Sequence, residues 1–455
     1  MNASAIILAA GSGTRMKSKK PKVAHELLGK PLVKWVVDSA RKAEVKKLVT
    51  VVGHGRDQVI PLVEHDASVI VQQNLRGTAD AVLECKEEFA DYEGSLLVLS
   101  GDSPLITPET LKALITKREK EQAAVVVLTM KPANPFGYGR IVRDEDGNVE
   151  RIVEQKDCTA EEAQINECNS GFYCFDAQAL FTALDQVGNQ NAQGEYYLTD
   201  VLEICRNEGR PVVALQTSHP EECLGINSRG QLAQATAHAQ RRINDQLMAE
   251  GVTMTDPTLV WVGPDVEVAS DVEILPMTFL YGKCSIGQDS VVGPNARLTD
   301  THVGEGCVVD ETISIEAQID DGATSGPRAY LRPGTHLCTN AKAGTHVEIK
   351  NSEVGEGSKV PHLSYIGDAT IGKNANVGAG SITCNYDGVK KHHTTIGDEA
   401  FIGSDTMMVA PVEIGAHAVI GAGSTITKNV SEGALGIERS KQTEISDWHK
   451  RKHGN

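Results

Sequence analysis

The chain has 455 residues, which is too long for one ordinary domain and predicts two or three. Acidic side chains outnumber basic ones by 61 to 44, and the formal net charge of -17 disfavours nucleic acid and anionic membrane surfaces as partners. Ten cysteines without a C-x-x-C pair indicate neither a zinc site nor a disulfide framework, so reduced thiols in the cytoplasm are expected.

The first half of the chain alternates short β-branched runs with helix-length segments. Such runs occupy 5–11, 47–53, 67–72 and 95–102, and 31–44 is an amphipathic helical window. This alternation predicts an α/β domain with a doubly wound, mostly parallel sheet. The first run is too short to span a bilayer and no basic region precedes it, so neither a membrane span nor a signal peptide is expected.

Residues 6–22 contain a glycine loop next to a basic cluster. The string "GSGTRMKS" nearly matches a P-loop, but Met16 stands where that motif and the dinucleotide fingerprint both need glycine. The amides of Gly11 and Gly13 can still wrap phosphate oxygens, while Arg15 and Lys22 can neutralise a leaving pyrophosphate. From Gly-x-Gly alone, a tight strand-to-helix turn without a ligand remains an alternative.

Asp102 follows the buried run 95–101, so its carboxylate lies at the carboxyl end of a predicted strand. Open α/β sheets bind ligands at this edge, and carboxylate oxygen suits Mg²⁺. A purely structural strand cap is the alternative. Further along, the Asp146-Gly147 pair between two strand-like runs predicts a hairpin over 140–154.

A helix and then a repeat fill the second half. Segment 228–250 is rich in Ala, Gln, Leu and Arg and free of proline, which predicts one long helix joining domains 1–227 and 251–455. Beyond it, aliphatic residues return every six positions, most regularly at Ile396, Ile402, Met408, Ile414, Ile420 and Ile426. A six-residue period places one aliphatic residue inside each side of a triangular coil, so a parallel β-helix is predicted. A glycine-rich β-sandwich would need period two and variable turns.

Several residues of the repeat region are chemically too specific for an inert coil. Arg332, Lys350, His362 and Tyr365 place a base beside cations that suit a phosphorylated sugar, and the excursion over 376–388 interrupts the register. A neutral imidazole can take a proton from an attacking amine. Taken singly, His362 would be a structural or surface histidine.

The string "LAAGSGTRMKSKKPK" followed by "LLGKPLVKWVV" resembles the signature of sugar-phosphate nucleotidylyltransferases. The repeats resemble those of hexapeptide-repeat acyltransferases, which implies that the coil is left-handed. Over essentially its whole length, the chain resembles the family of bacterial bifunctional enzymes that make UDP-N-acetylglucosamine. The resemblance implies acetyl transfer from acetyl-CoA to glucosamine 1-phosphate, and then transfer of UMP from UTP to the product with release of pyrophosphate.

For the first half, the resemblance implies a site for UTP and UDP-N-acetylglucosamine in which Arg15 and Lys22 are catalytic and Asp102 and Asn227 hold Mg²⁺. It assigns uracil recognition to Gln73 and the segment that follows. The implied binding residues are Leu8, Ala9, Ala10, Gly11, Gly13, Lys22, Gln73, Gly77, Thr78, Ser100, Gly101, Asp102, Gly139, Glu154, Asn169 and Asn227.

For the second half, the resemblance implies His362 as general base in an acetyl-transfer site shared between neighbouring β-helices of a homotrimer, with Mg²⁺ needed only by the first half. Glucosamine 1-phosphate would contact Arg332, Lys350, Tyr365 and Asn376, and acetyl-CoA would contact Ala379, Asn385, Tyr386, Ser404, Ala422 and Arg439.

Two other functions are weighed against this one. A nucleotidylyltransferase with a structural β-helix has no reason to carry Lys350, His362 and "CNYDG". A non-enzymatic assembly scaffold predicts eroded sites, yet Arg15 and Asp102 are intact.

Overall fold

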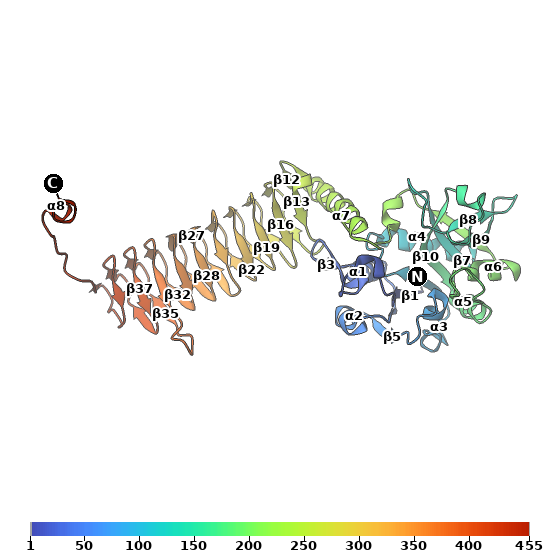
Figure 1. The fold of residues 1–455 in the computed structure, drawn as a ribbon, viewed down its shortest axis with the longest axis horizontal. Helices are drawn as coiled ribbons and strands as arrows, with labels where there is room; N and C mark the ends of the chain where they lie inside the picture. The colour runs from blue at the N-terminus through green and yellow to red at the C-terminus, as the bar shows by residue number, and fades with distance from the viewer. Residues whose placement is uncertain (1, 455) are drawn as a thin grey trace. The chain divides into compact units, whose positions relative to one another are not determined.

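The computed structural model describes residues 2–454, and the chain divides into two compact units (Figure 1). The first unit extends to Ala239 and the second begins at Gln240. This boundary falls inside α7 (Arg229–Ala249), which occupies the segment where a long helix was expected. Within residues 2–454, no helix is both long enough and apolar enough to cross a membrane.

A nine-stranded sheet forms the centre of the first unit. Its main path runs in the order β11 (Val212–Gln216), β7 (Val125–Met130), β10 (Cys168–Asp176), β6 (Ser95–Ser100), β1 (Ala3–Ala9), β4 (Leu48–Val52) and β5 (Ser68–Val71). Strand β1 pairs in parallel with β4 and β6, whereas β10 runs antiparallel to β6 and β7. The prediction of a mostly parallel sheet is confirmed.

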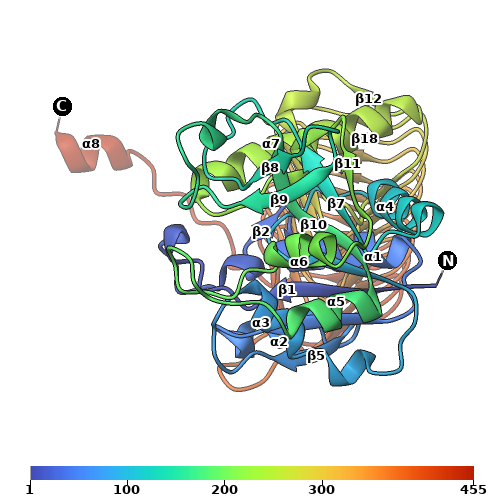
Figure 2. The same cartoon turned by 90° about the vertical axis from the view of Figure 1, so that its right-hand side faces the viewer.

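Helices cover both faces of this sheet, which explains why its strands are continuous apolar runs (Figure 2). Alternate residues of β1 enter different cores, with Ile6 on one face and Ile7 on the other. One face packs on α1 (Leu32–Lys42), α2 (Arg56–Val63) and α4 (Pro108–Glu121), and the other on α3 (Thr78–Leu83), α5 (Ala177–Leu184) and α6 (Asp200–Asn207).

The predicted hairpin is present. Strand β8 (Arg140–Arg143) pairs antiparallel with β9 (Val149–Val153). Gly147 has a φ of 81°, and its N–H donates to the carbonyl of Asp144 at 3.0 Å. Glycine adopts this left-handed conformation without steric cost, so the Asp-Gly signal located the turn correctly.

The second unit is a parallel β-helix, as predicted (Figure 1). Its three sheets run from β12 (Thr253–Met254) to β41 (Leu435–Gly436), from β13 (Val260–Val262) to β40 (Thr425–Ile426), and from β14 (Glu267–Val268) to β38 (Val412–Ile414). The residues of the six-residue repeat pass through all three sheets in turn. Ile396, Ile402 and Met408 lie in β35 (Thr394–Ile396), β36 (Phe401–Ile402) and β37 (Met407–Val409), and all are buried.

The second half of α7 closes the first coil of this β-helix. The side-chain amides of Gln240 and Asn244 donate to the carbonyl of Val260 at 2.7 and 2.9 Å, and Leu247 packs into the core. These contacts give the open end of the coil a polar cover, which repeat proteins need. At the other end the chain finishes in the exposed α8 (Trp448–His453).

Candidate active sites

A cavity of about 390 Å³ lies at the carboxyl ends of β1 and β6, where the sequence predicted a ligand site. The N–H of Gly101 donates to the carbonyl of Leu8 at 2.9 Å and holds the two strand ends together. The predicted residues that line the cavity are Leu8, Ala9, Ala10, Gly11, Lys22, Gly77, Thr78, Ser100 and Asp102.

The structure brings Lys22, Asp102 and Asn227 together although they are far apart in the chain. The Lys22 ammonium is paired with the Asp102 carboxylate and donates to Oδ1 of Asn227 at 2.9 Å. The side chains of Lys22 and Asp102 are only 14% and 19% exposed. A carboxylate and an amide oxygen thus already face one positive charge, and hard oxygen donors of this kind fit Mg²⁺.

The glycine loop is shaped around Lys22. Gly13 has a φ of 59°, and a Cβ added there would lie 2.5 Å from Cβ of Lys22, so any side chain would displace the lysine. No atom lies within 4 Å of a Cβ built at Gly11, which leaves its backbone open to the cavity. Met16 is buried under the loop, and Arg15 is exposed in η1 (Thr14–Met16) outside the residues that line the cavity.

The structure places the predicted Gln73 in solvent, away from the cavity, and the preceding Gln72 in its wall. Gln72 is 4% exposed, and its Nε2 donates to Oδ2 of Asp80 at 2.8 Å and to the carbonyl of Gly77 at 3.2 Å. Gln72 directly follows β5, whereas the chain bends at Gln73, so the two adjacent side chains have different surroundings. Glu195 also lines the cavity, and no sequence signal marked it.

Gly139, Glu154 and Asn169, predicted to hold the sugar, lie together next to the cavity residue Ser100. A Cβ at Gly139 would lie 3.4 Å from Oε1 of Glu154, and the N–H of Asn169 donates to the carbonyl of Gly139 at 2.9 Å. Ser100 donates to the carbonyl of Gly171 at 3.3 Å and links the group to β6. Burial raises the pKa of the Glu154 carboxyl.

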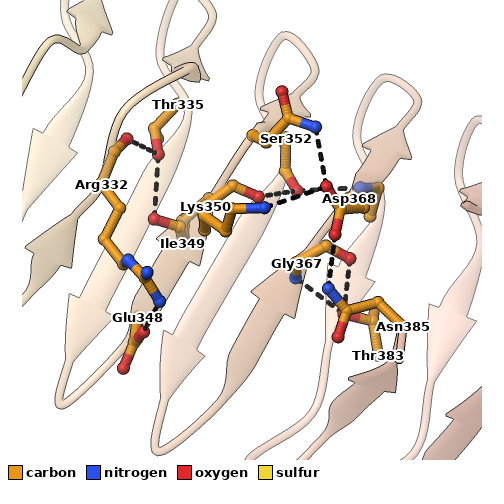
Figure 3. Close-up of polar contacts among 12 residues, drawn as sticks. Arg332, Thr335, Glu348, Ile349, Lys350, Ser352, Gly367, Asp368, Thr383 and Asn385 are labelled. Atoms are coloured by element: carbon orange, nitrogen blue, oxygen red, sulfur yellow. Dashed lines mark hydrogen bonds and ion pairs between the residues drawn. The ribbon is translucent and has the colours of Figure 1, made fainter. Parts of the chain in front are cut away.

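In the β-helix, Arg332 and Lys350 lie one above the other on successive coils (Figure 3). Arg332 follows β25 (Tyr330–Leu331), which pairs in parallel with β28 (Glu348–Lys350). Nη1 of Arg332 donates to Oε1 of Glu348 at 2.8 Å, and Nζ of Lys350 donates to Oδ1 of Asp368 at 3.2 Å. Both cations are therefore oriented by carboxylates.

Asp368, which the sequence analysis missed, connects two predicted binding residues. Besides Lys350, it accepts hydrogen bonds from Nδ2 of Asn351 at 2.7 Å and from Nδ2 of Asn385 at 2.5 Å. Burial by itself would raise the pKa of the Asp368 carboxyl, but the hydrogen bonds from Asn351, Asn385 and Lys350 outweigh it and hold that pKa below its usual value. Asp368 is therefore ionised and fixes Lys350 and Asn385 relative to each other.

A third cation, Lys391, was also missed. It follows the excursion over 376–388, in the loop between β34 (Ile382–Cys384) and β35, and an isolated β-bridge pairs it with Tyr386. Contact with the Lys350 ammonium lowers the pKa of Lys391, and the charge of Arg332 lowers it further. Lys391 therefore adds positive charge beside two cations that carboxylates already pair with, and a net positive charge favours an anion such as a phosphate monoester.

Gly367 provides room for two predicted polar groups. A Cβ at this position would lie 2.5 Å from the hydroxyl of Tyr365 and 2.7 Å from Nδ2 of Asn385. Tyr365 begins β31 (Tyr365–Gly367), and Asn376, another predicted sugar ligand, begins β33 (Asn376–Val377). Because Gly367 has no side chain, the phenol of Tyr365 and the amide of Asn385 can both occupy the space beside it.

His362 ends β30 (Lys359–His362) and is exposed. Among residues 2–454, none forms a side-chain hydrogen bond with its imidazole. Its carbonyl accepts from the N–H of Gly380 at 3.4 Å, which places His362 beside the turn that carries Ala379. The imidazole is accessible to an incoming amine.

Four of the predicted acetyl-CoA residues follow one corner of the coil, and Asn385 and Tyr386 do not. A Cβ at Gly378 would lie 2.5 Å from the backbone N of Ser404, and one at Gly403 would lie 2.5 Å from that of Ala422. Glycine is needed here because the corners stack so closely. Nη1 of Arg439 donates to the carbonyl of Ala422 at 2.8 Å, so Arg439 continues the line of residues along this corner. The row consists of Ala379, Ser404, Ala422 and Arg439, while Tyr386 is exposed on the excursion.

Comparison with known protein families defines the class. Residues 5–163 match the MobA-like NTP transferase domain, and residues 393–428 match the bacterial transferase hexapeptide model of six repeats. Together with the two folds, these matches define a nucleotidyltransferase domain followed by a left-handed β-helix of hexapeptide repeats.

Curated relatives identify the family. The chain is 46% identical over 444 residues to the bifunctional protein GlmU of Brevibacillus brevis, covering 98% of this chain and 96% of that one. It is 48% identical over 448 residues to the protein of the same name from Desulfitobacterium hafniense, with 98% of each covered. It is also 48% identical over 449 residues to the bifunctional protein GlmU of Heliobacterium modesticaldum, covering 99% of this chain and 98% of that one. The chain belongs to the GlmU family of bifunctional proteins, which favours two transferase activities over a nucleotidyltransferase with a structural β-helix.

Proposed function

We propose that the two clusters make UDP-N-acetylglucosamine in two transfers. Acetyl passes from acetyl-CoA to glucosamine 1-phosphate on the β-helix, and UMP then passes from UTP to N-acetylglucosamine 1-phosphate in the first unit. The observation that carries the proposal is that each unit holds its own hydrogen-bonded group of charged and polar side chains. One consists of Lys22, Asp102 and Asn227, and the other includes Arg332, Lys350 and Asp368. We place both reactions in the cytoplasm.

In uridylyl transfer, a phosphate oxygen of the sugar attacks the α-phosphorus of UTP while the bond to pyrophosphate breaks. The nucleophile is already anionic, so no general base is needed and catalysis rests on positioning and charge neutralisation. Lys22 and Arg15 supply positive charge at the glycine loop, and Gln72 is assigned to uracil. Gly139, Glu154 and Asn169 are assigned to the sugar.

Asp102 and Asn227 are the residues that would hold Mg²⁺. When bound, the ion neutralises phosphate charge and acts as a Lewis acid. Lys22 supports this assignment, because its single ammonium already contacts both side chains.

In acetyl transfer, His362 takes a proton from the attacking amine of glucosamine 1-phosphate. A C–N bond forms at the thioester carbonyl, the C–S bond breaks, and coenzyme A leaves as its thiol. Arg332, Lys350 and Lys391 neutralise the sugar phosphate, and Tyr365 and Asn376 are assigned to the sugar. Acetyl-CoA is assigned to Asn385, Tyr386 and the row Ala379, Ser404, Ala422 and Arg439.

We assign the acetyl-transfer site to a homotrimer in which neighbouring β-helices complete it. The eleven-stranded sheet that carries His362 also presents an apolar row, with Phe401 50%, Val419 41% and Leu435 64% exposed. These residues are neighbours on paired strands. A contiguous exposed apolar row supports an interface between copies.

A substrate-omission experiment tests the proposed order. The purified protein is incubated with glucosamine 1-phosphate, acetyl-CoA, UTP and Mg²⁺, and each is left out in turn. We expect UDP-N-acetylglucosamine only from the complete mixture, and accumulation of N-acetylglucosamine 1-phosphate when UTP is missing. Supplying N-acetylglucosamine 1-phosphate makes acetyl-CoA dispensable. If UDP-N-acetylglucosamine still formed from glucosamine 1-phosphate without acetyl-CoA, the order would be wrong.

A further inference from the structure

A group of ligand-type side chains lies on the nine-stranded sheet of the β-helix, outside both proposed active sites. Strands β23 (Gln318–Ile319), β26 (Thr335–Leu337) and β29 (Ser352–Val354) are neighbours there. Leu337 is fully buried in the core of the coil, so His336 before it and Cys338 after it both face outward.

The register brings three different ligand types together across two coils. Gln318 pairs with His336 and Ile319 with Leu337, so the next residues, Asp320 and Cys338, occupy equivalent positions. Nε2 of His336 lies 2.7 Å from Oδ2 of Asp320 and 3.9 Å from Sγ of Cys338. One ligand atom from each of the three residues lies within 4.8 Å of the others, and all three side chains are half-buried.

Neighbouring side chains surround two of these ligands, and a hydrogen bond orients Asp320. Nε2 of Gln318 donates to the other carboxylate oxygen of Asp320, Oδ1, at 2.7 Å. On the next coil, Oε2 of Glu353 lies 3.7 Å from Nδ1 of His336. Glu353 is thus a carboxylate near the second ring nitrogen, beyond hydrogen-bond distance but within ion-pair range of it.

We propose that Asp320, His336 and Cys338 bind Zn²⁺. Imidazole, thiolate and carboxylate are the ligand types that zinc takes in tetrahedral sites, and three protein ligands leave a fourth position for water. Mg²⁺ disfavours sulfur and nitrogen, so this site has a different ion preference from the Asp102 and Asn227 pair. The ion would tie two successive coils together through side chains on one outer face.

A simple surface ion pair between His336 and Asp320 is the competing explanation, and it gives Cys338 no part. Cobalt(II) distinguishes the two, because it replaces zinc in such sites and a thiolate ligand produces a near-ultraviolet charge-transfer band. The full-length protein, stripped of metal, is titrated with Co²⁺ in excess Mg²⁺, which occupies hard-oxygen sites. We expect a band that saturates at one equivalent per chain and disappears when Zn²⁺ is added.

Variants assign the band to the site. Cys338→Ser abolishes it, whereas Cys384→Ser, which changes the other half-buried cysteine of this unit, leaves it unchanged. Asp320→Asn keeps the shape of the side chain and weakens Co²⁺ binding roughly tenfold or more. Circular dichroism of each variant verifies the fold. Absence of the band in the unaltered protein, or its survival in a folded Cys338→Ser variant, would overturn the proposal.

Discussion

At one side chain, the Lys22 ammonium contacts oxygens of Asp102 and Asn227, which lie just after β6 and just before α7. The residue types in these motifs were predictable, because phosphate and hard cations require them. That these three side chains lie in contact was not predictable, because it depends on how the sheet brings the ends of distant segments together. Gln72 and Gln73 show most clearly what cannot be predicted from sequence. The two are chemically identical, and only the direction of the chain after β5 decides which one faces the cavity.

This pair provides a matched test of the nucleotide cavity. Gln72→Ala removes a side chain from the cavity wall, and we expect the KM for UTP to rise roughly tenfold, as for the loss of one buried hydrogen bond. Gln73→Ala should leave that KM unchanged. Steady-state kinetics of uridylyl transfer measures both values. Equal effects of the two substitutions, with both variants folded, would contradict the assignment.

Asp200, the first residue of α6, gives a pH-dependent prediction for stability. Burial raises the pKa of its carboxyl to about 6 from 3.8, with further contributions from Glu203 and Asp157. Because the folded-state pKa is the higher one, the protonated form is favoured by folding, and this contribution is lost as the pH rises from about 4 through about 6.

Asp200→Asn should therefore stabilise the protein at pH 7.5 by on the order of 1 to 2 kcal/mol, with the gain shrinking toward pH 4. Thermal unfolding of both proteins across this pH range measures the difference. Asp91→Asn, at an exposed position, is the control and should change little. A gain that grew on acidification would reverse the predicted sign.

At the element scale, the coils of the β-helix followed directly from sequence period, and the excursion after β34 was visible as an interruption of that period. What the excursion contacts was not visible. Asn385 reaches back to Asp368, and Lys391 approaches Lys350, because the loop folds over the neighbouring coil. Period gives the strand positions, but contacts between loops depend on backbone geometry that has no repeat.

Asp368 is predicted to be a positioning residue for acetyl transfer. Asp368→Asn keeps the size of the side chain but removes the charge that orients Lys350 and Asn385, so kcat/KM for acetyl transfer should fall roughly tenfold. Uridylyl transfer should be unchanged. Glu356→Gln, which alters an exposed carboxylate that pairs with Lys373, is the matched control. Unchanged KM values for glucosamine 1-phosphate and acetyl-CoA, together with an unchanged kcat, would refute this role.

At the scale of the whole molecule, assembly should matter to only one of the two reactions. Phe401→Glu places a charge in the row of exposed apolar residues, and we expect it to shift a homotrimer to monomers in light scattering. The rate of acetyl transfer should decrease as the trimer is lost. Uridylyl transfer should persist, because its cavity is built within one unit. A monomeric variant that retained full acetyl transfer would contradict a site shared between copies.

In the proposed function, one chain carries two independent transfer sites linked by a diffusible intermediate. Mixing two disabled variants tests it most directly. Asp102→Ala should still acetylate glucosamine 1-phosphate, and His362→Ala should still convert supplied N-acetylglucosamine 1-phosphate, but neither alone should make UDP-N-acetylglucosamine from glucosamine 1-phosphate. The mixture of the two should make it. If either folded variant lost both half-reactions, or the mixture remained inactive while each half-reaction worked, the account would be wrong.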